Sequence, residues 1–236
     1  MFCRIADLIT DVPTAGGLAS RCAAYACGNN DGADITIRTE LYRKALYPAS
    51  WTENMVAYME SAYQFYLQLI GFDGLFLHAS AVVLDGKAYL FSGKSGAGKS
   101  THTRLWQQVY GDRARVINDD KPALRRIDGR WIAYGTPWCG KDGINLNEQA
   151  PLAGICFLKK SHRNAIRRLD KRDALAQILS QTIYRFPDRQ KMDMLFDLVE
   201  KLLSEIPVYE LENLPEPDAA RLSHKTMLCG AQEAGL

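Results

Sequence analysis

The segment that most constrains this chain is GKSGAGKS, residues 93–100. It satisfies G-x-x-x-x-G-K-[ST], the Walker A pattern of a phosphate-binding loop between a strand and a helix. Its glycines Gly93, Gly96 and Gly98 allow backbone N–H groups to approach phosphate oxygens without a Cβ clash. The apolar residues 88–91 precede the loop and a helical pattern follows it. The sequence therefore predicts a strand–loop–helix unit within an α/β fold.

The loop predicts nucleotide-binding residues over its whole length. Lys99 is expected to reach the β/γ-phosphate oxygens and Ser100 to ligate Mg²⁺, while the helix that begins near Lys99 points its N-terminus at the same anion. We expect Lys94 to be solvated, facing the phosphates without a catalytic role. The expected nucleotide-binding set is Gly93, Lys94, Ser95, Gly96, Ala97, Gly98, Lys99, Ser100 and Thr101.

Two Asp-Gly pairs, at 85–86 and 128–129, each separate two apolar runs and predict tight hairpins. Hence an antiparallel strand should precede the loop strand, and the sheet should be mixed. Amphipathic patterns predict helices over 52–71, 100–110, 173–186 and 191–206, and strands over 34–42, 114–118, 152–160 and 208–214. We expect a small N-terminal α+β extension, 1–72, packed on a core domain, 73–227, with a frayed tail, 228–236.

Asp119 and Asp120 end the strand pattern that follows the loop helix. At the end of a neighbouring strand they should lie beside the loop, where one carboxylate holds Mg²⁺ or its water and the other accepts a proton from an attacking hydroxyl. The alternative is a polar turn, because Asn-Asp-Asp before Lys-Pro is good turn chemistry.

Three further features have a functional and a structural interpretation. His78 precedes the hairpin and should share the open end of the sheet with the loop, to bind a phosphoryl oxygen or a metal, or it is a structural histidine. Lys141, in the irregular segment 133–147, neutralises the transferring phosphoryl group or is simply solvated; Cys139 beside it is a small loop residue. The basic run 158–173 is a docking face for an acidic acceptor, a source of cations near the phosphates, or a solvated helix–loop surface.

The stretch LHASAVVLDGKAYLFSGKSGAGKS, followed by NDD, resembles the catalytic domain of HPr kinase/phosphorylase, a relative of the ATP-dependent phosphoenolpyruvate carboxykinases. The resemblance covers residues 74–125 well and the fold to about 225 more loosely. It implies a P-loop kinase that uses Mg·ATP and a serine acceptor. His78 then matches the active-site histidine, Lys99 the loop lysine, Ser100 the metal ligand, and Asp120 the carboxylate that takes the serine proton.

This chain departs from that family in two respects. The Leu-Glu-x-Arg-Gly signature, whose glutamate helps bind metal, is absent, and residues 1–72 are smaller than the family's N-terminal domain. HPr itself is therefore not the expected substrate. We expect instead a stand-alone variant of the family that acts on another protein or on a peptide. The resemblance also implies a homo-oligomer.

Composition narrows the remaining possibilities. With a net charge of +2, the chain as a whole has too little positive charge to bind nucleic acid or an anionic membrane by general electrostatic attraction. No apolar run approaches the roughly 20 residues that span a bilayer. The start has no apolar signal-peptide core, and six scattered cysteines suggest neither disulfides nor zinc. We expect a cytoplasmic, Mg²⁺- and ATP-dependent kinase acting on a hydroxyl, most readily a serine of a protein or peptide. The alternatives are a small-molecule kinase or carboxykinase-like enzyme, and an ATP-binding regulatory module without transfer.

Overall fold

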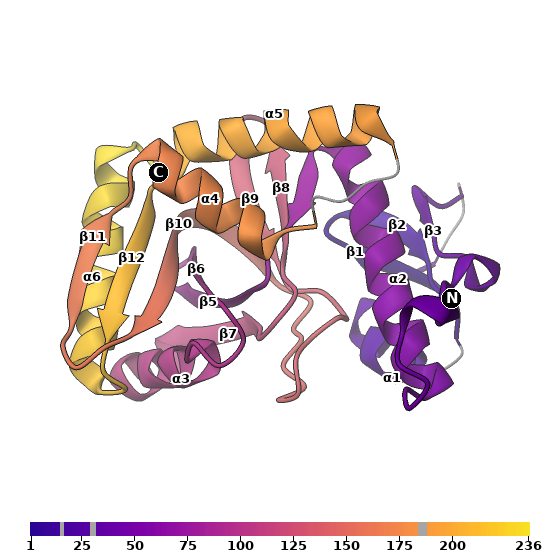
Figure 1. The fold of residues 1–236 in the computed structure, drawn as a ribbon, viewed down its shortest axis with the longest axis horizontal. Coiled ribbons are helices and arrows are strands. Elements are labelled where there is room, and N and C mark those ends of the chain that lie inside the picture. Colours follow the sequence, from indigo (N-terminus) through magenta and orange to yellow (C-terminus); the bar gives the residue numbers. More distant parts are fainter. Residues whose placement is uncertain (15–16, 29–31, 184–187) are drawn as a thin grey trace.

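The computed structural model describes residues 1–14, 17–28, 32–183 and 188–236. Its strands come in runs, β1–β2, β4–β6 and β7–β11, that are separated by helices (Figure 1). The described strands are β1 Phe2–Ile5, β2 Leu8–Asp11, β3 Ile35–Thr36, β4 Gly74–Phe76, β5 Ala79–Leu84, β6 Lys87–Ser92, β7 Ala114–Asn118, β8 Ala123–Ile127, β9 Arg130–Tyr134, β10 Gln149–Lys160, β11 Ala165–Arg168 and β12 Val208–Asn213. The described α-helices are α1 Leu18–Cys22, α2 Glu53–Leu69, α3 Lys99–Tyr110, α4 Lys171–Gln181, α5 Arg189–Glu205 and α6 Pro217–Glu233.

The described strands form a small β1-β2-β3 sheet and a nine-stranded mixed sheet. Within the large sheet, the order β4-β8-β9-β10-β6-β5-β7 is extended by β12, which pairs with β10, and by β11 beyond it. The long strand β10 joins the antiparallel strands β4, β8 and β9 to the strands around the loop, since it runs antiparallel to β9 and parallel to β6 and β12. This arrangement confirms the predicted α/β class with a mixed sheet.

Both predicted hairpins are present. The turn between β5 and β6 has φ of 50° at Asp85 and 77° at Gly86, and the turn between β8 and β9 has 48° at Asp128 and 79° at Gly129. Positive φ at both central residues is the type I′ geometry, whose twist matches that of the flanking strands. The first of these hairpins brings the chain back along the sheet just before the glycine-rich loop.

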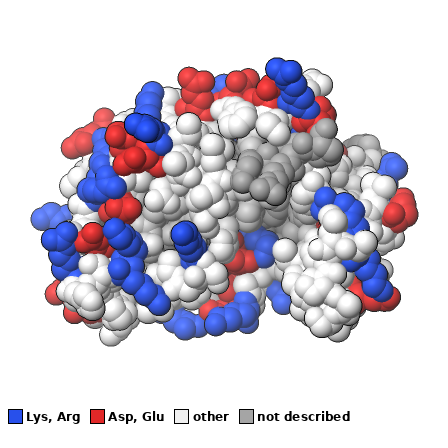
Figure 2. Space-filling model, in the orientation of Figure 1, with Lys and Arg blue, Asp and Glu red and all other residues white. Residues whose placement is uncertain are grey.

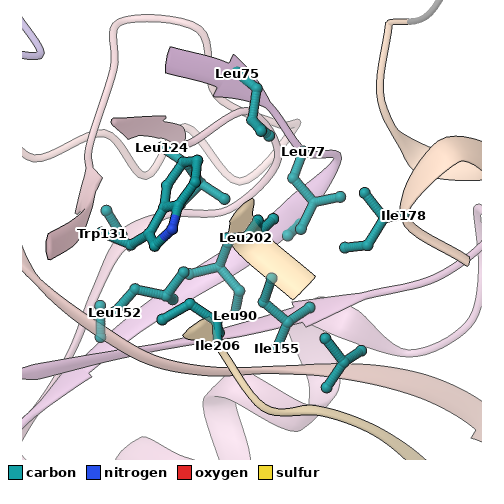
Figure 3. Close-up of a cluster of buried hydrophobic side chains, with 14 of the residues drawn as sticks. Leu75, Leu77, Leu90, Leu124, Trp131, Leu152, Ile155, Ile178, Leu202 and Ile206 are labelled. Atoms are coloured by element: carbon teal, nitrogen blue, oxygen red, sulfur yellow. The ribbon is translucent and has the colours of Figure 1, made fainter. Parts of the chain in front are cut away.

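The strand of that hairpin nearest the loop is buried on both faces. In β6, Ala88 and Leu90 face one core cluster, and Tyr89 and Phe91 face the other, as the two-residue period of a strand requires. Helices α4 and α5 supply the first cluster, part of which Figure 3 shows around Leu90 and Leu202, and α3 and α6 supply the second. The sheet is thus the middle of three layers at the loop.

Residues from the N-terminal segment form a third cluster. Strands β1–β3 and helices α1 and α2 contribute most of it, and Ala123, Tyr134 and Trp138 from the large sheet and its connections complete it. Thr52 caps α2, because its side chain accepts a hydrogen bond from the Met55 N–H. The N-terminal segment therefore packs directly on the rest of the chain; the boundary at residue 72 stays a prediction.

The prediction of a frayed tail at 228–236 is wrong. Helix α6 continues to Glu233, and Met227, Gly230 and Ala231 are buried. The face that α6 buries consists largely of small residues, which give a weak apolar pattern in the sequence. Close packing against β12 and β10, rather than large side chains, holds this end of the chain.

Other expectations need smaller corrections. Of the strand expected over 34–42, only Ile35–Thr36 forms, and a 3₁₀ turn follows at Thr39–Leu41. The basic run contains strand β11 rather than a helix–loop surface, because β12 offers it a pairing edge. The helix expected over 173–186 ends at Gln181, and residues 184–187 lie outside the described residues. None of the described helices has both the length and the apolar character to cross a membrane.

We predict that Gly230→Ala destabilises the protein by about 1–3 kcal/mol. A Cβ at this position would lie 1.8 Å from the hydroxyl of the buried Tyr209 and 3.1 Å from its Cζ. Urea denaturation measures the change. In the Tyr209→Phe background the contact with the hydroxyl is removed and only the tight 3.1 Å approach to Cζ remains, so the same substitution should cost less than in the parent protein. If this end of the chain were frayed, alanine alone would stabilise it, since alanine is about 1 kcal/mol more favourable than glycine in a helix.

Candidate functional site

The glycine-rich loop between β6 and α3 is held closely against β10. Gly93 has φ of 140°, and a Cβ there would lie 3.1 Å from Ala97 Cβ and 3.2 Å from the Leu158 carbonyl oxygen. Gly98 has φ of 102° and caps α3, so Lys99 is the first helical residue. These backbone conformations favour glycine, which explains the spacing of the motif.

Lys99 is turned inward. Its Nζ donates a hydrogen bond to the Gly93 carbonyl oxygen at 3.1 Å, and only 9% of the residue is exposed. Burial lowers the pKa of this ammonium group, while the charge of Asp120 opposes the change. A cation held at this depth beside a helix N-terminus favours an anionic ligand.

Helix α3 is anchored from behind the loop by His102. The fully buried imidazole accepts a hydrogen bond from Trp106 Nε1 at 3.3 Å through its Nε2, which lies 3.0 Å from the Ser223 hydroxyl of α6. Because burial disfavours the charged ring, it lowers the pKa of His102 to about 4. The start of α3 is thus tied to the helix that the sequence did not predict.

The turn after β7 is organised by Asn118. Its Oδ1 accepts hydrogen bonds from the backbone N–H groups of Asp120, at 2.9 Å, and Lys121, at 2.6 Å. Its Nδ2 donates to the carbonyl oxygens of Thr136 and Trp138 at 3.0 and 3.2 Å. The predicted polar turn therefore exists, and it also presents the two carboxylates to a cleft.

The two aspartates have different surroundings. Asp119 is buried, and its Oδ1 accepts the Gly140 N–H at 2.5 Å; burial raises the pKa of this carboxyl, although that hydrogen bond opposes the change. Burial also raises the pKa of Asp120, but the His78 hydrogen bond and the Lys121 ammonium outweigh it and lower the pKa to about 2. Asp120 is consequently ionised at neutral pH, with Oδ1 3.0 Å from His78 Nε2 and Oδ2 paired with Lys121.

His78 lies where the hairpin geometry predicted, at the open end of the sheet beside the loop. Its Nδ1 is 3.0 Å from Gln181 Oε1, and its backbone N–H donates to the Gln181 carbonyl oxygen at 2.8 Å. The end of α4 therefore positions the imidazole against Asp120.

These groups line one cleft of about 490 Å³. Of the residues expected from the sequence, the cleft is lined by His78, Ser95, Gly96, Gly98, Lys99, Ser100, Thr101, Asp119, Asp120 and Lys141. Gly93, Lys94 and Ala97 line a neighbouring cavity of about 450 Å³ on the other side of the loop. The expected site residues are thus brought together, with these three loop residues displaced to one side.

Cys139 lies next to the cleft but is poorly suited to nucleophilic chemistry. Burial raises the pKa of its thiol, although the Arg21 guanidinium, 2.6 Å from Sγ, opposes the change. A thiol with a raised pKa is mostly protonated at neutral pH and is a weak nucleophile.

Sequence reasoning missed several residues that line the cleft or contact the residues lining it. Lys121 directly follows the aspartate pair, and its position was the available signal; Gln181 gave none, because it lies 103 residues from His78. Arg104 and Asp142 form an ion pair of 3.0 Å at the rim. Lys160, part of the basic run, also lines the cleft.

Two arginines of the basic run face the carboxylates of β12. Arg167 pairs with Glu210 at 3.0 Å, and Arg163 with Glu212 at 2.8 Å. Figure 2 shows basic and acidic side chains interspersed on the face drawn, rather than separated by sign. This pattern agrees with the solvated surface and disfavours a strongly cationic docking face.

Helix α2 supports the cleft from the N-terminal side. The Tyr58 hydroxyl donates to the Cys139 carbonyl oxygen, and Ser61 Oγ accepts the Trp138 Nε1–H at 2.9 Å. The Tyr66 hydroxyl donates to the carbonyl oxygen of Lys121. Side chains from one helix thus hold both the aspartate turn and the segment that carries Lys141.

The fold and this cleft define an α/β protein whose glycine-rich loop faces a pair of carboxylates. A family model described as "SynChlorMet cassette protein ScmC" matches residues 45–214, more than half of the chain. The chain belongs to the ScmC family. Among solved structures it is similar to the Hpr(Ser) kinase/phosphatase from Coxiella burnetii, at 14% identity and a TM-score of 0.37, over 68% of this chain and 96% of that one. No curated protein matches it.

We predict that acidification weakens folding through His102. Its pKa lies below the usual 6.5 in the folded state, so its contribution is intact above pH 6.5 and is lost as pH falls toward 4. Between pH 7 and pH 5 the loss should be about 2 kcal/mol. Denaturation of His102→Gln across this range should show a correspondingly shallower pH dependence. An equal slope in both proteins would contradict the assignment.

Proposed function

We propose that this protein is a Mg·ATP-dependent kinase that transfers the γ-phosphoryl group to a serine hydroxyl of a peptide or protein. The observation that carries the proposal is the shared cleft of Lys99, at the head of α3, and the ionised Asp120, bound to His78. Phosphoryl transfer needs these two elements, a cationic cradle for phosphates and a carboxylate for the acceptor hydroxyl, in one place. The motif resemblance to HPr kinases supports the same assignment.

The loop side of the cleft is suited to the nucleotide. Ser95, Gly96 and Gly98 present backbone to the cleft, and α3 adds its N-terminal dipole. Lys99, which donates to a carbonyl oxygen in this structure, would exchange that partner for a phosphate oxygen. Because the ammonium group is already desolvated, its charge acts strongly on a bound phosphate.

The residues present fit Mg²⁺. Ser100 and Asp119 supply the oxygen donors that this ion prefers, and a nearby cation would favour the ionised form of Asp119, which burial disfavours. When bound, Mg²⁺ neutralises charge on the transferring phosphates. Gly140 keeps the Asp119 carboxylate turned toward the cleft through its N–H.

Asp120 takes the proton of the serine hydroxyl that receives the phosphoryl group. The serine oxygen forms its bond to the γ-phosphorus as the bond to the bridging oxygen of ADP breaks, and the hydroxyl proton passes to the carboxylate. Each carboxylate oxygen has a further lone pair besides the one that meets His78 or Lys121. With a pKa of about 2 Asp120 is a weak base, so it orients the hydroxyl first and takes the proton late in the transfer.

His78 and Lys141 would act on the phosphoryl group. Both line the cleft, and as hydrogen-bond donors they would stabilise negative charge there. A cytoplasmic location suits an ATP-dependent enzyme, and the family's description as a cassette protein fits an enzyme that works with others encoded beside it.

We predict that Lys99→Ala and Asp120→Asn each slow phosphoryl transfer by at least about a hundredfold. The assay is single-turnover transfer from γ-labelled ATP and Mg²⁺ to acceptors in a lysate of source cells. Asp120→Asn should bind nucleotide within a few-fold of the parent. The matched control is Asp193→Asn. The Asp193 carboxylate is exposed on α5 and does not line the cleft, so this variant should transfer phosphate at the parent rate.

The outcomes separate the candidate functions. Label on a protein or peptide that is lost with Asp120→Asn supports the proposal. Label confined to small molecules would make the protein a metabolite kinase or a carboxykinase-like enzyme. Tight ATP binding with no transfer would leave a nucleotide-binding regulatory module.

A second prediction isolates Asp119. Mg²⁺ should tighten nucleotide binding by the parent protein, and Asp119→Asn should remove about tenfold of that gain while leaving affinity in excess chelator nearly unchanged. Titration of a fluorescent ATP analogue with and without Mg²⁺ measures both values. Equal losses in the two conditions would mean that Asp119 supports the fold of the cleft rather than the ion.

A further inference from the structure

A second concave surface lies on the N-terminal side of the cleft. Helices α1 and α2 and the residue Trp51 enclose a groove of about 470 Å³. We call it the α1–α2 groove; its walls are formed by Leu18, Trp51, Met55, Tyr58 and Met59, with Arg21 at one side. Met55 is 45% exposed, so the groove opens to solvent with apolar walls.

The groove adjoins the proposed transfer site through Tyr58. The ring of Tyr58 lies 5.3 Å from the Lys121 ammonium, which pairs with Asp120. The hydroxyl of Tyr58 bonds to the carbonyl oxygen of Cys139, two residues before Lys141 of the cleft. One side chain therefore forms a wall of the groove and touches both segments that carry the proposed catalytic groups.

Arg21 gives the groove a positive charge that no described carboxylate pairs with. Among the described residues that line the groove, Arg21 alone is charged, with its guanidinium 5.1 Å from the Tyr58 ring and 2.6 Å from Cys139 Sγ. Of the described residues, none places a carboxylate within ion-pair distance of Arg21. A half-buried guanidinium beside apolar walls favours an anionic partner, and planar carboxylates suit its geometry.

We infer that the α1–α2 groove binds the acceptor as a peptide, with a large apolar side chain against Met55 and Met59 and an acidic side chain on Arg21. This inference rests on the proposed kinase function, because the groove matters through its nearness to Asp120. Because Tyr58, a wall of the groove, lies 5.3 Å from the Lys121 ammonium that pairs with Asp120, and an extended chain spans about 3.3 Å per residue, we place the anchoring residues roughly two to four positions from the phosphorylated serine. A small metabolite would not occupy both places, so the groove selects a polypeptide acceptor.

The test uses synthetic peptides of eleven residues with one central serine. One set carries leucine and glutamate at two to four positions from the serine on either side, and the matched set carries alanine and glutamine there. Transfer from γ-labelled ATP gives kcat and KM, and fluorescence anisotropy of labelled peptides gives binding without catalysis. We expect the leucine and glutamate peptide in the best register to have a kcat/KM at least about tenfold higher, mainly through a lower KM.

Two variants locate the effect. Met55→Asp should abolish the preference for leucine, and Arg21→Glu should abolish the preference for glutamate and create one for lysine at the same position. Thermal unfolding and nucleotide affinity should match those of the parent protein. The reversal of charge preference is a result that simple destabilisation would not produce.

The possible results distinguish this inference from the function on which it rests. Transfer to peptides whose selection is unchanged by both variants would overturn the groove and leave the kinase. Peptide binding that responds to both variants without any transfer would overturn the kinase function alone. If Met55→Asp instead dissociates a dimer, a second copy of this chain fills the groove and the peptide inference is wrong.

Discussion

The side chain of Asn118, fully buried at the end of β7, joins the segments that form the cleft. Its Oδ1 receives the N–H groups of the aspartate turn, and its Nδ2 binds carbonyl oxygens of the segment that leads to Lys141. A buried amide with both ends satisfied is costly to disrupt, because each freed partner would lose a hydrogen bond away from water. The positions of Asp119 and Asp120 relative to the loop depend on this interaction.

The N-terminal helix α2 adds the second support. Its Tyr58, Ser61 and Tyr66 bind the cleft segments from outside, so the N-terminal residues are more than a cover for the sheet. Tyr58 also forms a wall of the α1–α2 groove, so the helix that stabilises the cleft borders that groove as well. Under the proposed function, structural support and acceptor selection would therefore be coupled.

Much of the fold follows from short-range patterns. The Asp-Gly turns, the capped helix α2 and the strand–loop–helix unit were predictable, because type I′ turns, N-caps and glycine-rich loops depend on a few neighbouring residues. Helix α6 and the short extent of β3 were not, because small-residue packing and strand pairing depend on partners distant in the chain. Strand β11 forms within a basic run only because β12 supplies both backbone partners and carboxylates.

The site divides in the same way. Residues 93–101, the aspartate pair and His78 could be identified from the sequence, because their spacing around a hairpin and a helix brings them to one end of the sheet. Only the tertiary structure placed Gln181 on His78 and Tyr58 between the cleft and the α1–α2 groove. These contacts join segments whose separation along the chain leaves no local signal, whereas Lys121, which pairs with Asp120, is its neighbour in the sequence. The sequence by itself determined the glycine-rich motif and the aspartate pair, whereas folding decided which other groups lie beside them, since side chains from distant elements must meet to form the cleft.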